Sequence, residues 1–104
     1  MKFIRFAFLI STLFSAFANA DGYTDCTVNI DKIYYGDNGN LYIYFVGGGS
    51  MQIPSSHQDQ NEALSIAMSA FVAKKKVVIR SWTPNFPTCN NGFQDFRGIF
   101  LTNY

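Results

Sequence analysis

The longest regular pattern of apolar residues lies at positions 61–73 and has the spacing of an α-helix. Its main stripe follows the i, i+3, i+4, i+7, i+8 rule and consists of Leu64, Ala67, Met68, Phe71 and Val72. A second stripe beside it holds mostly small residues, at Ala63, Ile66, Ala70 and Ala73. The wide apolar arc predicts a deeply buried helix that plugs a core through large side chains such as Phe71. The alternative is that part of the arc meets another subunit.

Both ends of this predicted helix carry recognisable signals. Asp59 and Glu62 have the spacing of a capping box, in which two side chains bond the first free N–H groups. Lys74, Lys75 and Lys76 follow the last apolar position, and cations suit the partial negative charge of a helix C-terminus. These signals predict a helix from about residue 59 to about residue 73.

Short β-branched and aromatic runs predict five strands, at residues 26–35, 41–46, 51–53, 77–82 and 96–102. The first run changes phase near Ile33, as a bulge or bend would make it. The first two runs are separated by Gly and Asn residues at 36–40, which is typical of a hairpin turn.

The order of these elements is three strands, a helix and two strands. This is the order of an OB-fold, a partly open five-stranded barrel with the helix between strands 3 and 4. The alternative is an α+β two-layer sandwich, in which the helix lies across one face of an antiparallel sheet.

The first twenty residues have the pattern of a secretory signal peptide. Lys2 and Arg5 precede an apolar run at 6–17, and Ala18-Asn19-Ala20 is an A-x-A cleavage site. We therefore expect residues 1–20 to be removed, leaving one domain at 21–104 with no membrane span. The run is short for a transmembrane helix, which needs about 20 apolar residues. The protein is expected to be secreted or periplasmic.

Cys26 and Cys89 are the two cysteines of the chain, and both lie after the predicted cleavage site. In an oxidising compartment two cysteines allow one pairing, so the sequence predicts a Cys26–Cys89 disulfide. Two distant thiols are too few for a metal site, and a C-x-x-C redox motif is missing from the sequence.

Charge and motifs argue against several functions. Eight Lys and Arg stand against seven Asp and Glu, and two of the basic residues belong to the leader, so nucleic-acid binding lacks electrostatic support. His57 is the one histidine, and its polar neighbours favour a solvated position before the helix over a catalytic one. We expect no catalytic residue, no cofactor and no metal, and hence no enzyme.

Aromatic residues make up 17% of the chain, which is more than a small core needs. Tyrosines beside Asn and Asp are typical of carbohydrate sites, where a ring packs on sugar C–H groups and polar neighbours bind hydroxyls. Packing of Tyr34, Tyr42 and Tyr44 in the core or across a hairpin is the alternative. The residues predicted to contact a ligand are Tyr34, Asp37, Asn38, Trp82 and Asn90.

Residues 62–101 contain a predicted helix ending in lysines, a Val77-Val78-Ile79 strand, a loop with Cys89 and a closing Gly98-Ile99-Phe100-Leu101 strand. This combination resembles small exported bacterial proteins of unassigned function. The order of elements is also similar to the B subunits of AB5 toxins of the subtilase-cytotoxin and pertussis type. That resemblance implies an OB-fold, assembly into a homo-oligomeric pentamer and binding of host glycans.

The sequence therefore predicts a non-enzymatic binding domain with a glycan or protein ligand. One form of this hypothesis is a glycan-binding subunit similar to a toxin B subunit. The other is a monomeric cell-envelope accessory or inhibitor protein that binds another protein.

Overall fold

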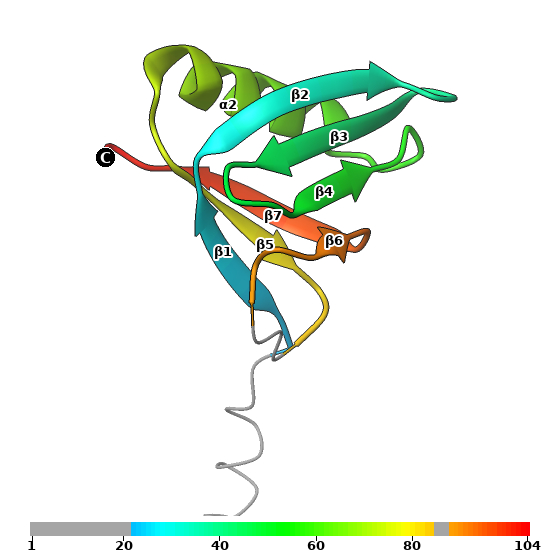
Figure 1. The fold of residues 1–104 in the computed structure, drawn as a ribbon. Helices are drawn as coiled ribbons and strands as arrows, with labels where there is room; N and C mark the ends of the chain where they lie inside the picture. The colour runs from blue at the N-terminus through cyan, green and yellow to red at the C-terminus, as the bar shows by residue number, and fades with distance from the viewer. Residues whose placement is uncertain (1–21, 85–87) are drawn as a thin grey trace, which may run out of the picture.

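The computed structural model describes residues 22–84 and 88–104, so the predicted leader and its cleavage site lie outside the described residues. These residues form seven β-strands and one α-helix (Figure 1). The elements are β1 (Thr24–Val28), β2 (Ile30–Gly36), β3 (Asn40–Phe45), β4 (Ser50–Ile53), α2 (Gln60–Ala73), β5 (Val77–Ser81), β6 (Gly92–Phe93) and β7 (Phe96–Leu101). The predicted class, mainly β with one helix, is confirmed.

The strands form two sheets, and neither sheet closes into a barrel within the described ranges. Sheet A has the order β1-β5-β7 and is antiparallel. Sheet B has the order β2-β3-β4-β6, in which the β4–β6 pair is parallel and the others are antiparallel. Two sheets with a helix packed beside them fit the α+β sandwich better than a closed five-stranded barrel.

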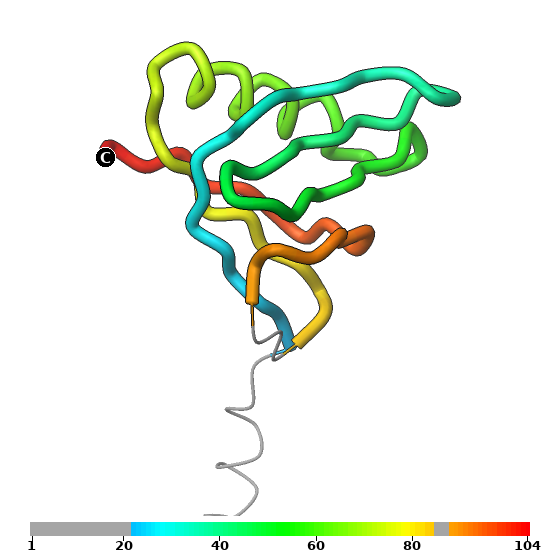
Figure 2. Tube along the Cα trace, viewed as in Figure 1, coloured from blue at the N-terminus to red at the C-terminus, as the bar shows by residue number. Residues whose placement is uncertain are grey.

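Two short connections carry the chain from one sheet to the other. Asn29 alone separates β1 from β2, and the trace in Figure 2 turns sharply there. Gln94 and Asp95 separate β6 from β7. The predicted bulge in the first run is a register shift between Ile30 and Lys32, which follows the change of sheet at Asn29.

Alternating side chains of both sheets form the core. On β3 and β4 every second residue is buried, and the same holds for β5. The fully enclosed large side chains are Leu41, Ile43, Met51, Ile53, Val77 and Ile79. Burying one such side chain contributes about 1.5–3 kcal/mol, so this alternation is the main source of stability.

The helix packs through its small residues, which corrects the prediction. Ala63, Ala67 and Ala70 are buried, whereas Phe71 is 46% exposed and Val72 is 77% exposed. Small side chains let a helix backbone approach its neighbours closely, and α2 contacts β2 and β7 in this way. In Figure 1 the helix lies beside β2 at the top of the view, and β6 lies below β4.

The start of the helix is held by His57 rather than by a capping box. The Asp59 side chain makes no capping hydrogen bond. Instead the Asp59 N–H donates to Nδ1 of His57 (3.1 Å), so the proton of the neutral ring lies on Nε2, which donates to the Phe96 carbonyl (3.2 Å). The expectation of a solvated histidine is wrong, because this half-buried ring connects α2 to β7.

Gln60 adds a second connection from the helix start to sheet B. Its Nε2 donates to the carbonyls of Gly39 (2.8 Å) and Ile53 (3.0 Å). The side chain is buried, and its two bonds satisfy carbonyls at the ends of β4 and of the β2–β3 turn.

At its other end the helix stops in a left-handed turn. Lys74 has φ 58° and ψ 41°, and the Lys75 N–H donates to the Ala70 carbonyl (2.9 Å). This is the bonding pattern of a Schellman motif, in which glycine usually occupies the left-handed position that Lys74 has here. Lys74, the first of the three lysines that follow the apolar stripes, is thus the residue that ends the helix.

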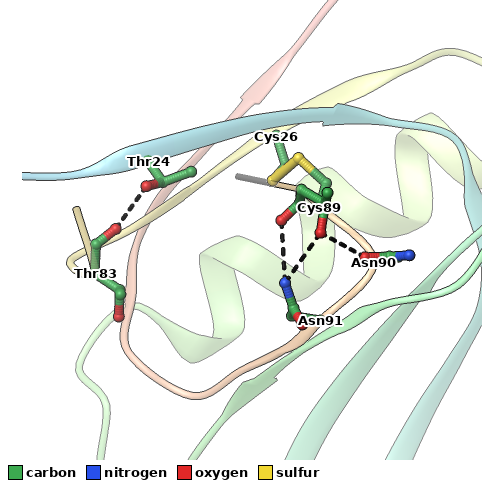
Figure 3. The surroundings of a disulfide bond; sticks show 7 residues. Thr24, Cys26, Thr83, Cys89, Asn90 and Asn91 are labelled. Atoms are coloured by element: carbon green, nitrogen blue, oxygen red, sulfur yellow. Dashed lines mark hydrogen bonds between the residues drawn. A yellow bond between two sulfur atoms is a disulfide. The ribbon is translucent and has the colours of Figure 1, made fainter. Parts of the chain in front are cut away.

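The predicted Cys26–Cys89 disulfide is confirmed (Figure 3). It joins β1 to the loop before β6, with 5.7 Å between the two Cα atoms. The same region is tied by the Thr24 hydroxyl, which donates to the Thr83 carbonyl (2.6 Å), and by the Asn91 amide, which donates to the Thr88 carbonyl (3.2 Å). A disulfide is consistent with a compartment outside the cytoplasm.

Among the residues that the structure describes, none belongs to a helix of the length and apolar character that crossing a membrane requires.

Candidate functional site

Three tyrosines form a row on the outer surface of sheet B. The alternation that buries Leu41 and Ile43 turns Tyr42 and Tyr44 to the other face of β3, and Tyr34 pairs with Tyr42 across the hairpin. The Tyr34 and Tyr42 ring centroids are 5.7 Å apart, and those of Tyr42 and Tyr44 are 6.3 Å apart with planes inclined by only 19°. We call Tyr34, Tyr42 and Tyr44 the tyrosine face.

Polar side chains surround the tyrosine face. The register of β4 places Gln52 opposite Tyr42 and Ser50 opposite Tyr44. The Lys32 ammonium lies 5.0 Å from the Tyr44 ring centroid, a distance at which a cation is attracted by the ring. A depression of about 330 Å³ lies between Lys32, Tyr34 and Tyr44. Aromatic surface and hydrogen-bonding groups are therefore adjacent.

The β2–β3 turn lies at one end of this face. Asp37, Asn38 and Gly39 all have positive φ, at 48°, 70° and 83°, and the Asn40 amide donates to the Asp37 carbonyl (3.0 Å). The Tyr34 hydroxyl donates to the Asp37 carboxylate (3.4 Å). The negative charge of Asp37 raises the pKa of the Tyr34 hydroxyl above its ordinary value, which extends the pH range over which the hydroxyl keeps its proton.

The five predicted ligand residues fall in three separate places. Tyr34, Asp37 and Asn38 lie together at the β2–β3 hairpin. Trp82 follows β5 in sheet A, and its backbone N–H donates to the Asp95 carbonyl (2.9 Å). Asn90 lies in the disulfide loop near Gly48, at the other end of β3, where its side-chain oxygen accepts from the Thr88 hydroxyl (2.6 Å). These residues cannot all contact one small ligand.

The prediction missed Tyr42, Tyr44, Lys32 and Gln52 as members of the site. The sequence carried a usable signal for the tyrosines, because Tyr42 and Tyr44 alternate with buried residues and stand opposite β2 across a short turn. The tyrosine rings pack against one another across the strands, which was the alternative to ligand binding. The two interpretations are compatible because the packed rings remain on the surface.

The tyrosine face offers aromatic rings and hydrogen-bonding groups to a ligand. Within residues 22–84 and 88–104 there is no group of three or more His, Cys, Asp or Glu residues that could hold a metal ion. Both ring nitrogens of His57 take part in backbone hydrogen bonds. The tyrosine face can stack against a flat, weakly polar ring, while Gln52, Ser50 and Lys32 provide hydrogen bonds at its border.

A comparison with known protein families and with curated proteins finds no match to this chain.

Proposed function

We propose that this protein is a non-enzymatic carbohydrate-binding domain that uses the tyrosine face. The observation that carries the proposal is the row of three tyrosine rings, spaced 5.7 and 6.3 Å apart, on the outer surface of sheet B. A sugar ring presents C–H groups on its faces and hydroxyls around its edge. The tyrosine rings are suited to pack against the C–H faces, and Gln52, Ser50 and Lys32 are suited to hydrogen-bond the hydroxyls at the edge.

We also propose that the two sheets correspond to the two halves of a partly open OB-type barrel. Support comes from the β1–β2 run that changes sheet at Asn29, from the parallel β4–β6 pair and from the single helix between β4 and β5. OB-folds bind oligosaccharides and oligonucleotides on the face of strands 2 and 3. Those strands would be β3 and β4, which carry Tyr42, Tyr44 and Gln52. The small number of basic residues favours the oligosaccharide.

The proposed site of action is the periplasm or the exterior of the cell. The disulfide supports an oxidising compartment, and the leader pattern at residues 1–20 supports export. A protein that acts like a toxin B subunit would also assemble into a ring of identical subunits. Light scattering coupled to size-exclusion chromatography measures the oligomeric state, and a monomer at micromolar concentration would contradict the ring without contradicting glycan binding.

A glycan array with the exported protein tests carbohydrate binding. Tyr42→Ala removes the middle ring of the row, so it should weaken binding of any retained glycan at least about tenfold, which corresponds to about 1.4 kcal/mol. Tyr35→Ala is the matched control, because Tyr35 follows Tyr34 on the same strand, has 60% of its surface exposed and points to the other face. Equal effects of the two changes, or an array without any retained glycan, would refute the proposal.

One observation favours the second candidate, a cell-envelope protein that binds another protein. Met68, Phe71 and Val72 are exposed together on α2, and adjacent apolar side chains on a small surface helix are suited to a protein partner. Under this alternative Phe71→Glu would abolish capture of one specific envelope protein, and Tyr42→Ala would not. The opposite result, loss with Tyr42→Ala alone, would reject it.

A further inference from the structure

The outer surface of sheet A carries a stack in which aromatic rings and arginines alternate. The Arg97 guanidinium carbon lies 4.2 Å from the Trp82 ring centroid and 4.8 Å from that of Tyr23. The Arg80 guanidinium carbon lies 3.9 Å from the Tyr23 centroid and 5.0 Å from that of Phe100. The order is therefore Trp82, Arg97, Tyr23, Arg80 and Phe100, which we call the arginine ladder.

The two arginines of the ladder differ in what their N–H groups do. Arg80 binds Asp25 with two parallel bonds, from Nε to Oδ1 (2.7 Å) and from Nη2 to Oδ2 (2.9 Å). Within the described residues the Arg97 side chain has no ion pair and donates no hydrogen bond to protein, and the rings of Trp82 and Tyr23 lie against its guanidinium. Because rings lie close to the guanidinium of Arg97, its orientation is held while its N–H groups remain available.

Trp82 stands at the open end of the ladder. It is 55% exposed although Arg97 lies against its ring, so aromatic surface remains for a ligand. Gly98 lies opposite Arg80 on β7, and nothing lies within 4 Å of the position that a Cβ would take there. The surface beside the arginines is therefore open.

We propose that Arg97 and Trp82 form a binding site for a carbohydrate that carries a carboxylate or a sulfate group. A guanidinium is planar and can donate two parallel hydrogen bonds to such an oxyanion, and its stacking here fixes the direction of those donors. The exposed Trp82 ring would pack against the sugar ring that bears the anion.

A carbohydrate fits this surface better than an acidic peptide does. Acidic peptide motifs are typically bound by clusters of arginines. Here Arg80 is already paired with Asp25, which leaves the Arg97 guanidinium beside the exposed ring of Trp82. One guanidinium next to an aromatic ring suits a ligand that stacks on the ring and presents a single anion.

The charges around Arg97 set the strength expected of this site. Asp25 is paired with Arg80, and its pKa is lowered chiefly by the hydrogen bond from Arg80, with smaller contributions from the charges of Arg80 and Arg97. Asp95 is two positions from Arg97 in the sequence and accepts hydrogen bonds from the hydroxyls of Ser81 and Thr83. Because these partners are neutral, they do not offset the negative charge of the carboxylate near Arg97. Binding should consequently be moderate and should weaken as salt is added.

Trp82 is the one tryptophan of the chain, so intrinsic tryptophan fluorescence reports on this site alone. The exported protein is titrated with a sulfated heparin tetrasaccharide, with tetragalacturonate and with neutral cellotetraose. A saturable change with one or both of the acidic sugars, at least tenfold weaker with cellotetraose, is expected. The two acidic arms show whether sulfate, carboxylate or both are accepted.

Substitutions then assign the effect to residues. Arg97→Gln and Arg97→Lys should each weaken acidic-sugar binding at least about tenfold, the second because a lysine keeps the charge but loses the planar pair of donors. Lys74→Gln is the control for charge, because it removes one positive charge from the exposed end of α2 and should change affinity less than twofold. Circular dichroism confirms that each variant is folded, and if Arg97→Gln does not fold, Arg97→Lys decides.

Three results would overturn the proposal: no saturable change with either acidic sugar, equal losses in Arg97→Gln and Lys74→Gln, or binding of hexaglutamate as tight as that of the acidic sugars. The site is independent of the tyrosine face. Tyr42→Ala should leave the Trp82 signal intact, and Arg97→Gln should leave glycan binding at the tyrosine face intact, so the two proposals can fail separately.

Discussion

Gly49 offers a sharp test of how the disulfide loop packs against sheet B. It has φ 95°, and a Cβ added there would overlap the Cys89 carbonyl oxygen and lie 2.9 Å from the Asn90 Cα. Gly47, in the same turn, has φ 92° with nothing within 4 Å of its Cβ position. Gly47→Ala and Gly49→Ala therefore share the backbone strain, and only Gly49→Ala adds a steric overlap with the loop.

The two changes should differ by a measurable free energy of unfolding. A non-glycine residue in a sparsely populated backbone region costs about 1–3 kcal/mol, and this applies to both variants. Overpacking adds about 1–3 kcal/mol, and the two nearest atoms at Gly49 belong to the backbone, which cannot move aside as a flexible side chain can. Gly49→Ala should thus be less stable than Gly47→Ala by about 1–3 kcal/mol.

Urea denaturation of the oxidised variants measures this difference. Repeating it in a Cys26→Ser/Cys89→Ser background should shrink the difference, because the loop can then move away, although the Ser50 N–H still bonds the Asn91 carbonyl (3.0 Å). Equal stability of the two glycine variants in the oxidised protein would show that the loop does not pack against Gly49 as described.

Three further predictions concern stability. Phe71→Ala should cost less than about 1.5 kcal/mol in a urea melt, because the ring is half exposed, whereas Ile43→Ala should cost about 2–5 kcal/mol; equal losses would contradict the helix orientation. Asp25→Asn should cost under about 1 kcal/mol at pH 7. The Arg80 guanidinium lowers the pKa of Asp25, so the stability that Asp25 contributes is present above the ordinary carboxyl pKa and is lost as pH falls below about 4. In melts, the difference in stability between the native protein and Asp25→Asn should therefore shrink from pH 7 to pH 2. A difference that grows in acid would contradict this reasoning. Lys74→Gly should raise the thermal midpoint by relieving φ 58°, by about 0.5–1 kcal/mol in stability, and a lower midpoint would mean that the left-handed turn is not formed.

The sheet elements could be predicted well because strand burial has a period of two. Leu41, Ile43 and Phe45 are buried, and the residues between them are not, as the alternation requires. The disulfide was predictable because two cysteines allow one pair. The separation into two sheets was not, since a single residue such as Asn29 carries no signal that the chain will change sheet.

The helix shows where pattern reasoning ends. Two apolar stripes lay side by side, and hydrophobicity alone favoured the one with Phe71 and Met68. The structure buries Ala67 of that stripe but leaves Phe71 and Met68 half exposed. It also buries Ala63 and Ala70 of the other stripe, so the contact with β2 and β7 is made through small residues. Only the turn part of the candidate site could be predicted from the sequence, for a related reason. The turn residues Asp37 and Asn38 are visible in sequence, but which of the tyrosines share a surface depends on strand register.

The pairing of β1 with β5 has a consequence for the time course of folding. Thr24, near the beginning of the described chain, pairs with Ser81, and β5 must also receive β7 before sheet A is complete. Strands β2, β3 and β4 meet through short turns and can assemble early, whereas sheet A requires the closure of a long loop. Non-local pairing slows folding, so the N-terminal strand should remain unpaired until most of the chain is present. The Cys26–Cys89 bond, which spans a sequence separation of 63, would then form late and preserve a sheet already assembled.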